Sequence, residues 1–250
     1  MLVVLLSQLL GTALTILLLP FFASWPPSTE ALWWGAAAGV GGGAGVLLLY
    51  RGLAKGRMSV VAPVTGVEAA GIPVVFALVI GERPSGLALA GVALGLIAVA
   101  LVSTAPGREP AARRNVAGLP EALGAGLAFG LFFICLDKAP DSAGIWPLIG
   151  ARASSILLVG VVALAARVDL VTARGHMPTI ALAGLLDVGA NIFYLLATQR
   201  GLLSLTAVLT SMYPGATVLL ARVILKERLA RVQLGGLAVA GVAVVLIGLG

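Results

Sequence analysis

Long apolar runs follow one another along almost the whole chain, separated by short segments that carry charged residues, proline or glycine. A helix needs about 20 apolar residues to cross a lipid bilayer, and nine runs approach or exceed that length. They fall at about 1–22, 31–50, 58–80, 86–104, 118–137, 145–166, 178–197, 203–225 and 231–250. The runs are continuous rather than alternating, which argues against the short strands of a membrane barrel. The pattern predicts an all-α, polytopic membrane protein with nine transmembrane helices.

Composition agrees with a membrane protein and excludes other classes. Of 250 residues, 60% are hydrophobic and 10% charged, whereas soluble domains carry about 25% charged residues. The net charge of +6 is scattered without a basic stripe, so no nucleic-acid partner is expected. Cys135 and His176 are the only cysteine and histidine, so we expect no disulfide, no metal site and no cofactor. The sequence also lacks HExxH, GxSxG and clustered aspartates, which argues against an intramembrane enzyme.

The two halves of the chain repeat each other. A shift of 145 residues aligns Gly56 with Gly201, Ser59 with Ser204, Glu82 with Glu227, Arg83 with Arg228 and Gly91 with Gly236. The same shift pairs four runs of the first half with runs six to nine and leaves run 118–137 without a partner. The repeating unit is therefore five helices, and an odd number places the two copies in opposite orientations across the bilayer. We assign 1–104 to the first copy, 105–117 to a linker and 118–250 to the second copy.

Several short motifs resemble the EamA-type members of the drug/metabolite transporter superfamily. In the first copy they are Leu49–Ala54, Gly56–Pro63 and Gly81–Pro84; in the second they are Tyr213-Pro214 and Lys226–Arg228. The resemblance implies a transporter with ten helices in two inverted five-helix repeats. Because the first copy shows four helices, we expect that the chain begins inside the protein and that a native form has one more helix upstream.

Glu68 is the clearest polar residue inside a run, about ten residues into 58–80, with Thr65 one turn before it. An ionisable residue in the hydrocarbon costs several kcal/mol unless it faces a cavity or a partner. One interpretation is a carboxyl group that takes up and releases a proton during transport, or that pairs with a cationic group of the substrate. The alternative is a protonated glutamic acid bonded to a neighbouring backbone carbonyl.

Run 203–225 carries a polar stripe. Thr206, Thr210, Tyr213 and Thr217 follow helical spacing and would lie on one face, which is expected to line a cavity. The alternative is that the threonine hydroxyls bond their own helix backbone. Pro214 removes a backbone donor and is expected to kink the helix there.

Run 178–197 carries a second group, in which Asp187, Asn191 and Tyr194 share one helical face. A carboxylate, an amide and a phenol together are suited to bind a polar or cationic metabolite. The alternative is a hydrogen-bonded cluster that holds the helices together. Arg152 lies near the start of run 145–166, where it either reaches the polar headgroups or lines the mouth of a cavity. The spacing of Gly35 and Gly39 predicts close helix packing rather than a phosphate site.

The sequence favours a secondary active transporter that exports a small polar or amphipathic metabolite or drug by alternating access. Exchange for protons is a hypothesis that rests on Glu68. The alternatives are a flippase for lipids or lipid-linked sugars and a membrane scaffold that does not transport. The expected partners are the small-molecule substrate, protons and the lipid bilayer, with the protein a monomer or a homodimer. We expect a multi-pass protein of a plasma or bacterial inner membrane.

Overall fold

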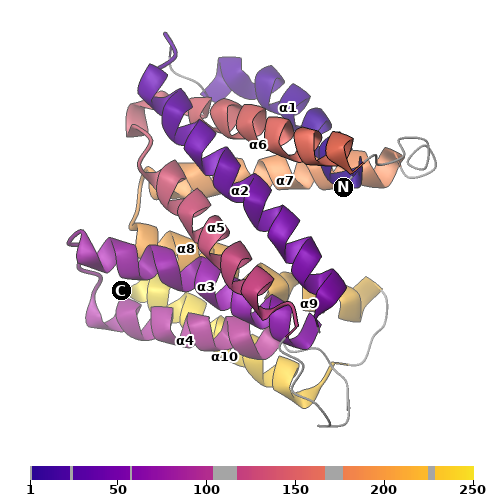
Figure 1. The fold of residues 1–250 in the computed structure, drawn as a ribbon. Coiled ribbons are helices and arrows are strands. Elements are labelled where there is room, and N and C mark those ends of the chain that lie inside the picture. Colours follow the sequence, from indigo (N-terminus) through magenta and orange to yellow (C-terminus); the bar gives the residue numbers. More distant parts are fainter. Residues whose placement is uncertain (1, 23–24, 57, 104–116, 167–176, 225–228) are drawn as a thin grey trace. The chain divides into compact units, whose positions relative to one another are not determined.

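The structure is a computed structural model that describes residues 2–22, 25–56, 58–103, 117–166, 177–224 and 229–250. These residues form ten α-helices and one short 3-10 helix, η1 (Asp141–Ala143), and contain no strand (Figure 1). The α-helices are α1 (Leu2–Phe22), α2 (Thr29–Lys55), α3 (Met58–Val79), α4 (Gly86–Val102), α5 (Leu119–Asp137), α6 (Trp146–Ala165), α7 (Met177–Thr198), α8 (Leu203–Ser211), α9 (Tyr213–Ile224) and α10 (Arg231–Leu249).

Every predicted apolar run contains helix, so the all-α fold class is confirmed. Seven helices are long and apolar enough to cross a membrane by length and composition, and α4 is an apolar helix of 17 residues. Run 203–225 differs, because it is divided into α8 and α9 at Met212. Pro214 lies in the first turn of α9, where its missing N–H leaves no helical hydrogen bond unmade. The expected irregularity near Pro214 is therefore present as a break between two helices.

The turn between α3 and α4 shows how the sequence ends one helix and starts the next. Gly81 has a φ of +103°, a conformation that glycine adopts without steric cost. Ser85 caps α4, and its side-chain oxygen accepts a hydrogen bond from the Ala88 N–H at 3.0 Å. Pro84 stands directly before this cap and cannot continue a helix from the preceding turn.

The chain divides into two compact units. Unit 1 comprises Met1–Ala44 and Leu131–Arg200, and unit 2 comprises Gly45–Gly130 and Gly201–Gly250. Unit 1 thus contains α1, α6 and α7 with the first part of α2 and the end of α5. Unit 2 contains α3, α4, α8, α9 and α10 with the rest of α2 and α5. Each unit draws helices from both copies of the repeat.

In unit 1, glycines bring helix backbones into direct contact. A Cβ atom at Gly35 or Gly39 of α2 would collide with the carbonyl groups of Pro147 and Ala151 in α6. The Ser154 hydroxyl donates to the Ala36 carbonyl at 2.8 Å across the same contact. These distances confirm the packing role predicted for the two glycines.

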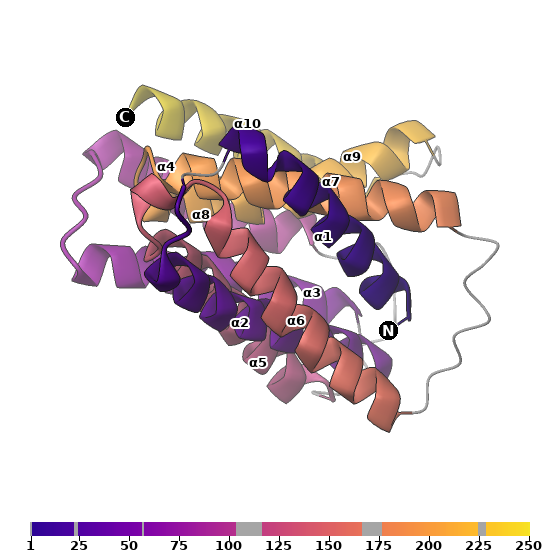
Figure 2. The same cartoon turned by 90° about the horizontal axis from the view of Figure 1, so that it is seen from above.

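A related glycine contact lies elsewhere in unit 1, where α1 packs against both α6 and α7 (Figures 1 and 2). A Cβ at Gly184 of α7 would lie 2.6 Å from the Ser7 carbonyl oxygen of α1. Gly184 is the counterpart of Gly39 under the shift of 145 residues. Both copies of the repeat therefore use the same position for a close helix crossing.

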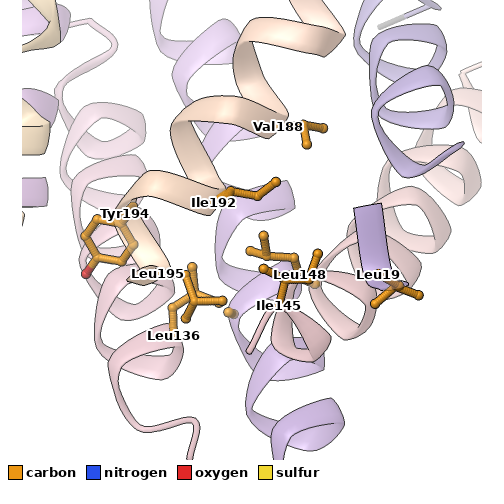
Figure 3. Packing of buried hydrophobic residues seen from close by; sticks show 10 residues of the cluster. Leu19, Leu136, Ile145, Leu148, Val188, Ile192, Tyr194 and Leu195 are labelled. Carbon is orange, nitrogen blue, oxygen red and sulfur yellow. The ribbon is translucent and has the colours of Figure 1, made fainter. Parts of the chain in front are cut away.

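A hydrophobic cluster completes unit 1. Figure 3 shows Val188, Ile192 and Leu195 of α7 gathered near Leu148 of α6. The Tyr194 ring lies on another side of α7 in the same view. The buried apolar face of α7 is thus fixed against its neighbours, which sets the rotation of the helix about its own axis.

In unit 2, α4 and α10 lie side by side and their contacts are reciprocal (Figure 1). A Cβ at Gly91 of α4 would lie 3.0 Å from the backbone N of Ile247, and a Cβ at Gly236 of α10 would lie 2.9 Å from that of Val102. Gly236 and Ile247 are the counterparts of Gly91 and Val102 under the repeat. Each glycine lies near the start of its helix and meets the end of the other, so equivalent helices are antiparallel. The inverted repeat predicted from the sequence is confirmed by this geometry.

Candidate functional site

The predicted site residues fall into two groups, one within each compact unit. Unit 2 holds Thr65 and Glu68 of α3 together with the residues of α8 and α9, and unit 1 holds Asp187, Asn191 and Tyr194 of α7.

Thr65 and Glu68 lie where α3 packs against α5. Thr65 is buried and its hydroxyl donates to the Ala122 carbonyl at 3.2 Å. One turn later Glu68 meets Gly126, where a Cβ atom would lie 2.5 Å from both Cβ and Oε2 of Glu68. The absence of a side chain at Gly126 therefore makes room for the carboxyl group beside α5.

Glu68 is the only charged residue of α3, and the residue is half-buried. Its Oε2 atom is buried and has no hydrogen-bond partner among the residues that the structure describes. The alternative interpretation requires a hydrogen bond from the protonated carboxyl group to a backbone carbonyl, and Oε2 makes no such bond in the described structure. A buried polar atom without a partner costs about 1–3 kcal/mol, which is easier to explain for a functional group than for a structural one.

In unit 1, the Asp187 carboxylate forms an ion pair with Arg152, with 2.5 Å between Arg152 Nη2 and Asp187 Oδ2. Asn191 donates from Nδ2 to Asp187 Oδ1 at 3.2 Å and to the Asp187 carbonyl at 2.7 Å. Asp187 and Asn191 are therefore brought together as predicted, and Arg152 joins them from α6.

The interpretation of Arg152 as a side chain that reaches the headgroups is wrong. Its side chain is only 11% exposed and points to Asp187, at the middle of α7. The sequence held a signal for this pair, because runs 1–22, 145–166 and 178–197 contain just two charged side chains, Arg152 and Asp187. Opposite charges inside hydrocarbon are expected to find each other.

Tyr194 is buried, and its role is tied to α5. Its hydroxyl donates to the Phe133 carbonyl at 3.1 Å, and the two rings lie 4.7 Å apart. It belongs to the hydrophobic cluster that also includes Leu195 and Leu136. These contacts agree with the interhelical hydrogen-bond alternative for this residue.

The polar stripe of run 203–225 was predicted for one continuous helix, and the break at Met212 divides it. The Thr206 hydroxyl donates to the Leu202 carbonyl four residues earlier. Thr210 is half-buried in α8, and Tyr213 is exposed at the start of α9. The side chains of Pro214 and Thr217 lie outside the described part of the chain. The Thr206 hydroxyl thus bonds a backbone carbonyl one turn earlier, as the alternative interpretation expects.

Glu82 has a role that the sequence analysis missed. Its carboxylate accepts hydrogen bonds from the N–H groups of Leu203 and Ser204, at 2.7 and 3.1 Å, and from the Ser204 hydroxyl at 2.6 Å. A carboxylate is favoured at a helix N-terminus by free N–H groups and by the helix dipole. Glu82 therefore ties the turn after α3 to the start of α8. Its repeat counterpart, Glu227, lies outside the described residues.

Within the described ranges, no group of three or more histidine, cysteine, aspartate or glutamate side chains could hold a metal ion. The two groups thus differ: unit 2 holds a carboxyl group with a buried oxygen that lacks a hydrogen-bond partner in the described structure, and unit 1 holds an ion pair with an amide.

Comparisons with known proteins agree with this fold. The model of the EamA-like transporter family matches twice, over residues 1–104 and 117–249. A crystal structure is similar over 99% of this chain and 87% of its own chain, with a TM-score of 0.78 and 19% sequence identity. It is one of 28 matching chains of known structure. No curated protein matches the sequence. The two family matches, on apolar helices arranged as an inverted repeat, show that the chain belongs to the EamA-like transporter family and is a multi-pass membrane transporter of the drug/metabolite transporter superfamily.

Proposed function

We propose that the protein is a secondary active transporter that exports a small polar or amphipathic metabolite or drug in exchange for protons, by alternating access. The observation that supports proton exchange is the buried Oε2 of Glu68, which lacks a hydrogen-bond partner in the described structure. An ionised carboxylate costs more at the middle of an apolar helix than its protonated form does. Glu68 can therefore bind a proton from one side of the membrane and lose it when the pathway opens to the other.

The position of Glu68 between α3 and α5 suggests how its protonation could depend on helix movement during transport. It lies beside Gly126 of α5, one turn from the Thr65 hydroxyl that bonds Ala122. A shift of α3 along α5 would change the space around the carboxyl group, because no side chain at Gly126 separates the two helices. We therefore expect proton binding at Glu68 to be coupled to movement of α3 along α5.

The test is transport in proteoliposomes with an imposed pH gradient. A panel of metabolites and drugs is first screened by thermal shift on the purified protein, because a ligand that binds the folded state raises its apparent stability. We expect the compounds that stabilise the protein to move against their gradient when protons move the opposite way, and Glu68→Gln to lose this dependence. Glu30→Gln, an exposed residue in the first turn of α2, is the matched control.

Transport by Glu68→Gln at the wild-type rate and with the wild-type pH dependence would falsify the role of Glu68. Stabilisation by lipids or lipid-linked sugars alone would instead favour a flippase. We place the protein in a plasma or bacterial inner membrane, as a monomer or homodimer, and detergent-free mass measurement of the purified protein distinguishes the two assemblies.

A further inference from the structure

The ion pair between Arg152 and Asp187 stands out within unit 1 because of its surroundings. Helices α1, α6 and α7 carry 63 residues between them without any other charged side chain. One cation and one anion are thus placed opposite each other in a set of three packed helices. An unpaired charge is costly where it is enclosed by apolar helices, so the two opposite charges are expected to stabilise each other.

The two partners differ in their exposure. The Arg152 side chain is 11% exposed, while that of Asp187 is 51% exposed. The guanidinium carbon lies where α1 presents Gly11, and a Cβ there would come within 3.8 Å of it. Arg152 is therefore enclosed by neighbouring helices, whereas about half of the surface of the Asp187 side chain remains exposed.

Both oxygens of Asp187 already receive a hydrogen bond from the protein. Oδ2 accepts from Arg152 and Oδ1 accepts from Asn191, which is itself fixed by a second bond to the Asp187 carbonyl. Each carboxylate oxygen has more than one acceptor position. The open half of the group can thus accept a further hydrogen bond without breaking either contact.

We propose that Arg152 is a positioning residue, which keeps Asp187 ionised and oriented as a fixed acceptor for a hydrogen-bond donor group of the transported molecule. This rests on the proposed transport function, and it assigns different tasks to the two carboxyl groups at the middle of helices. Glu68 changes its protonation state during transport, whereas Asp187 stays charged throughout. The substrate class implied at Asp187 is a molecule with an ammonium, amide or hydroxyl donor.

The contacts that the structure gives the Asp187 carboxylate are hydrogen bonds donated to its two oxygens. Arg152 is the only charged group that faces it from α6, and α1 contributes no charged side chain. Asn191 donates its N–H to Oδ1, a bond that an ionised oxygen accepts more strongly than a protonated one. The site is thus built around a hydrogen-bond acceptor held by two donors.

The first test measures stability and needs no substrate. We expect Arg152→Gln to melt at a lower temperature than the wild type at neutral pH and to regain stability as the pH falls, because Asp187 then becomes protonated and no longer needs a counter-ion. Asp187→Asn should stay destabilised at every pH, since Arg152 cannot be neutralised. The double variant Arg152→Gln/Asp187→Asn should be more stable than either single variant.

A packing role for the long Arg152 side chain predicts other results. The loss in Arg152→Gln would then be independent of pH, and the effects of the two single changes would add in the double variant. Either result would overturn the proposal. Arg152→Lys keeps the charge and is expected to restore a large part of the stability at neutral pH.

Infrared spectroscopy reads the protonation state directly. We expect no carboxylic acid C=O band from Asp187 in the wild type. In Arg152→Gln we expect such a band to appear as the pH falls, and it should be absent from the double variant. A band in the wild type that Asp187→Asn removes would show that Asp187 is protonated and would refute its role as a fixed acceptor. This readout does not depend on transport, so it remains decisive if Glu68 proves not to carry protons.

The acceptor role has a separate test with three small four-carbon probes. Butylammonium and butanamide donate hydrogen bonds, and butanoate only accepts them. We expect the two donors to raise the melting temperature of the wild type, butanoate not to, and the double variant to lose the response. Stabilisation by butanoate alone, equal shifts in the double variant, or no shift with either donor would each contradict the assignment.

Discussion

Gly91 of α4 contacts the end of α10, and Gly236 of α10 contacts the end of α4. These two equivalent contacts allow a quantitative test of the inverted repeat. Gly236→Ala would place a Cβ atom 2.7 Å from Val102 Cγ2 and 2.9 Å from both Leu101 Cβ and the Val102 backbone N. Real Cβ atoms essentially never come closer than 3.0 Å to another heavy atom. The Val102 N belongs to the backbone of α4, so the contact is relieved only if the two helices move apart.

The neighbouring residue provides a matched control. Gly235 has no atom within 4 Å of an added Cβ, so Gly235→Ala adds a methyl group in open space on the same helix. Alanine is favoured over glycine in helices by up to about 1 kcal/mol, and both variants receive this gain. Inserting a methylene into a packed contact costs about 1–3 kcal/mol. We therefore expect Gly236→Ala to be less stable than Gly235→Ala by about 1–3 kcal/mol.

The same change in the first copy should have a similar effect. A Cβ at Gly91 would lie 2.8 Å from Ile247 Cγ1 and 3.0 Å from both the Ala243 oxygen and the Ile247 nitrogen. Because the surroundings of the two glycines are related by the repeat, we expect Gly91→Ala and Gly236→Ala to be destabilised to a similar extent.

The assay is thermal unfolding of the purified protein in a mild detergent, followed by the fluorescence of its tryptophans. At this chain length, 1 kcal/mol shifts the melting temperature by about 2–4 °C. Equal melting temperatures for Gly235→Ala and Gly236→Ala would refute the close contact of α4 and α10. A large loss for Gly236→Ala with full tolerance of Gly91→Ala would show that the two contacts are not equivalent.

Two further predictions concern unit 2. Glu82→Ala removes three hydrogen bonds at the start of α8 and should lower the free energy of unfolding by about 1–2 kcal/mol. The N–H groups of Leu203 and Ser204 should then exchange hydrogen faster, and unchanged exchange there would contradict the role of Glu82. Gly126→Ala should displace the Glu68 carboxyl group and reduce proton-driven transport, whereas Gly71→Ala, with nothing within 4 Å, should not; equal rates for the two variants would argue against a requirement for space beside Glu68.

The sequence by itself determined the helices and their repetition. In a bilayer, backbone groups must be satisfied within each segment, so a run of about 20 apolar residues has little choice but to form a helix. The shift of 145 residues related the copies, and the odd number of helices fixed their opposite orientations, as the antiparallel pair α4 and α10 bears out. The spacing of Gly35 and Gly39 likewise predicted their role in helix packing.

Only the tertiary structure decided which polar groups meet. From the sequence, Arg152 lies near the start of its run and was open to two interpretations, but the packing of α6 against its neighbours directs its side chain to Asp187. In the sequence, Glu82 stood out only as a match between the two copies, yet its carboxylate contacts residues more than a hundred positions away. Helical periodicity places a side chain on a face, whereas the neighbour of that face depends on crossing points such as Gly39 and Gly184, where backbones touch. Each crossing joins two segments that lie far apart in the sequence, so the pattern within one segment cannot predict which segment will be its neighbour.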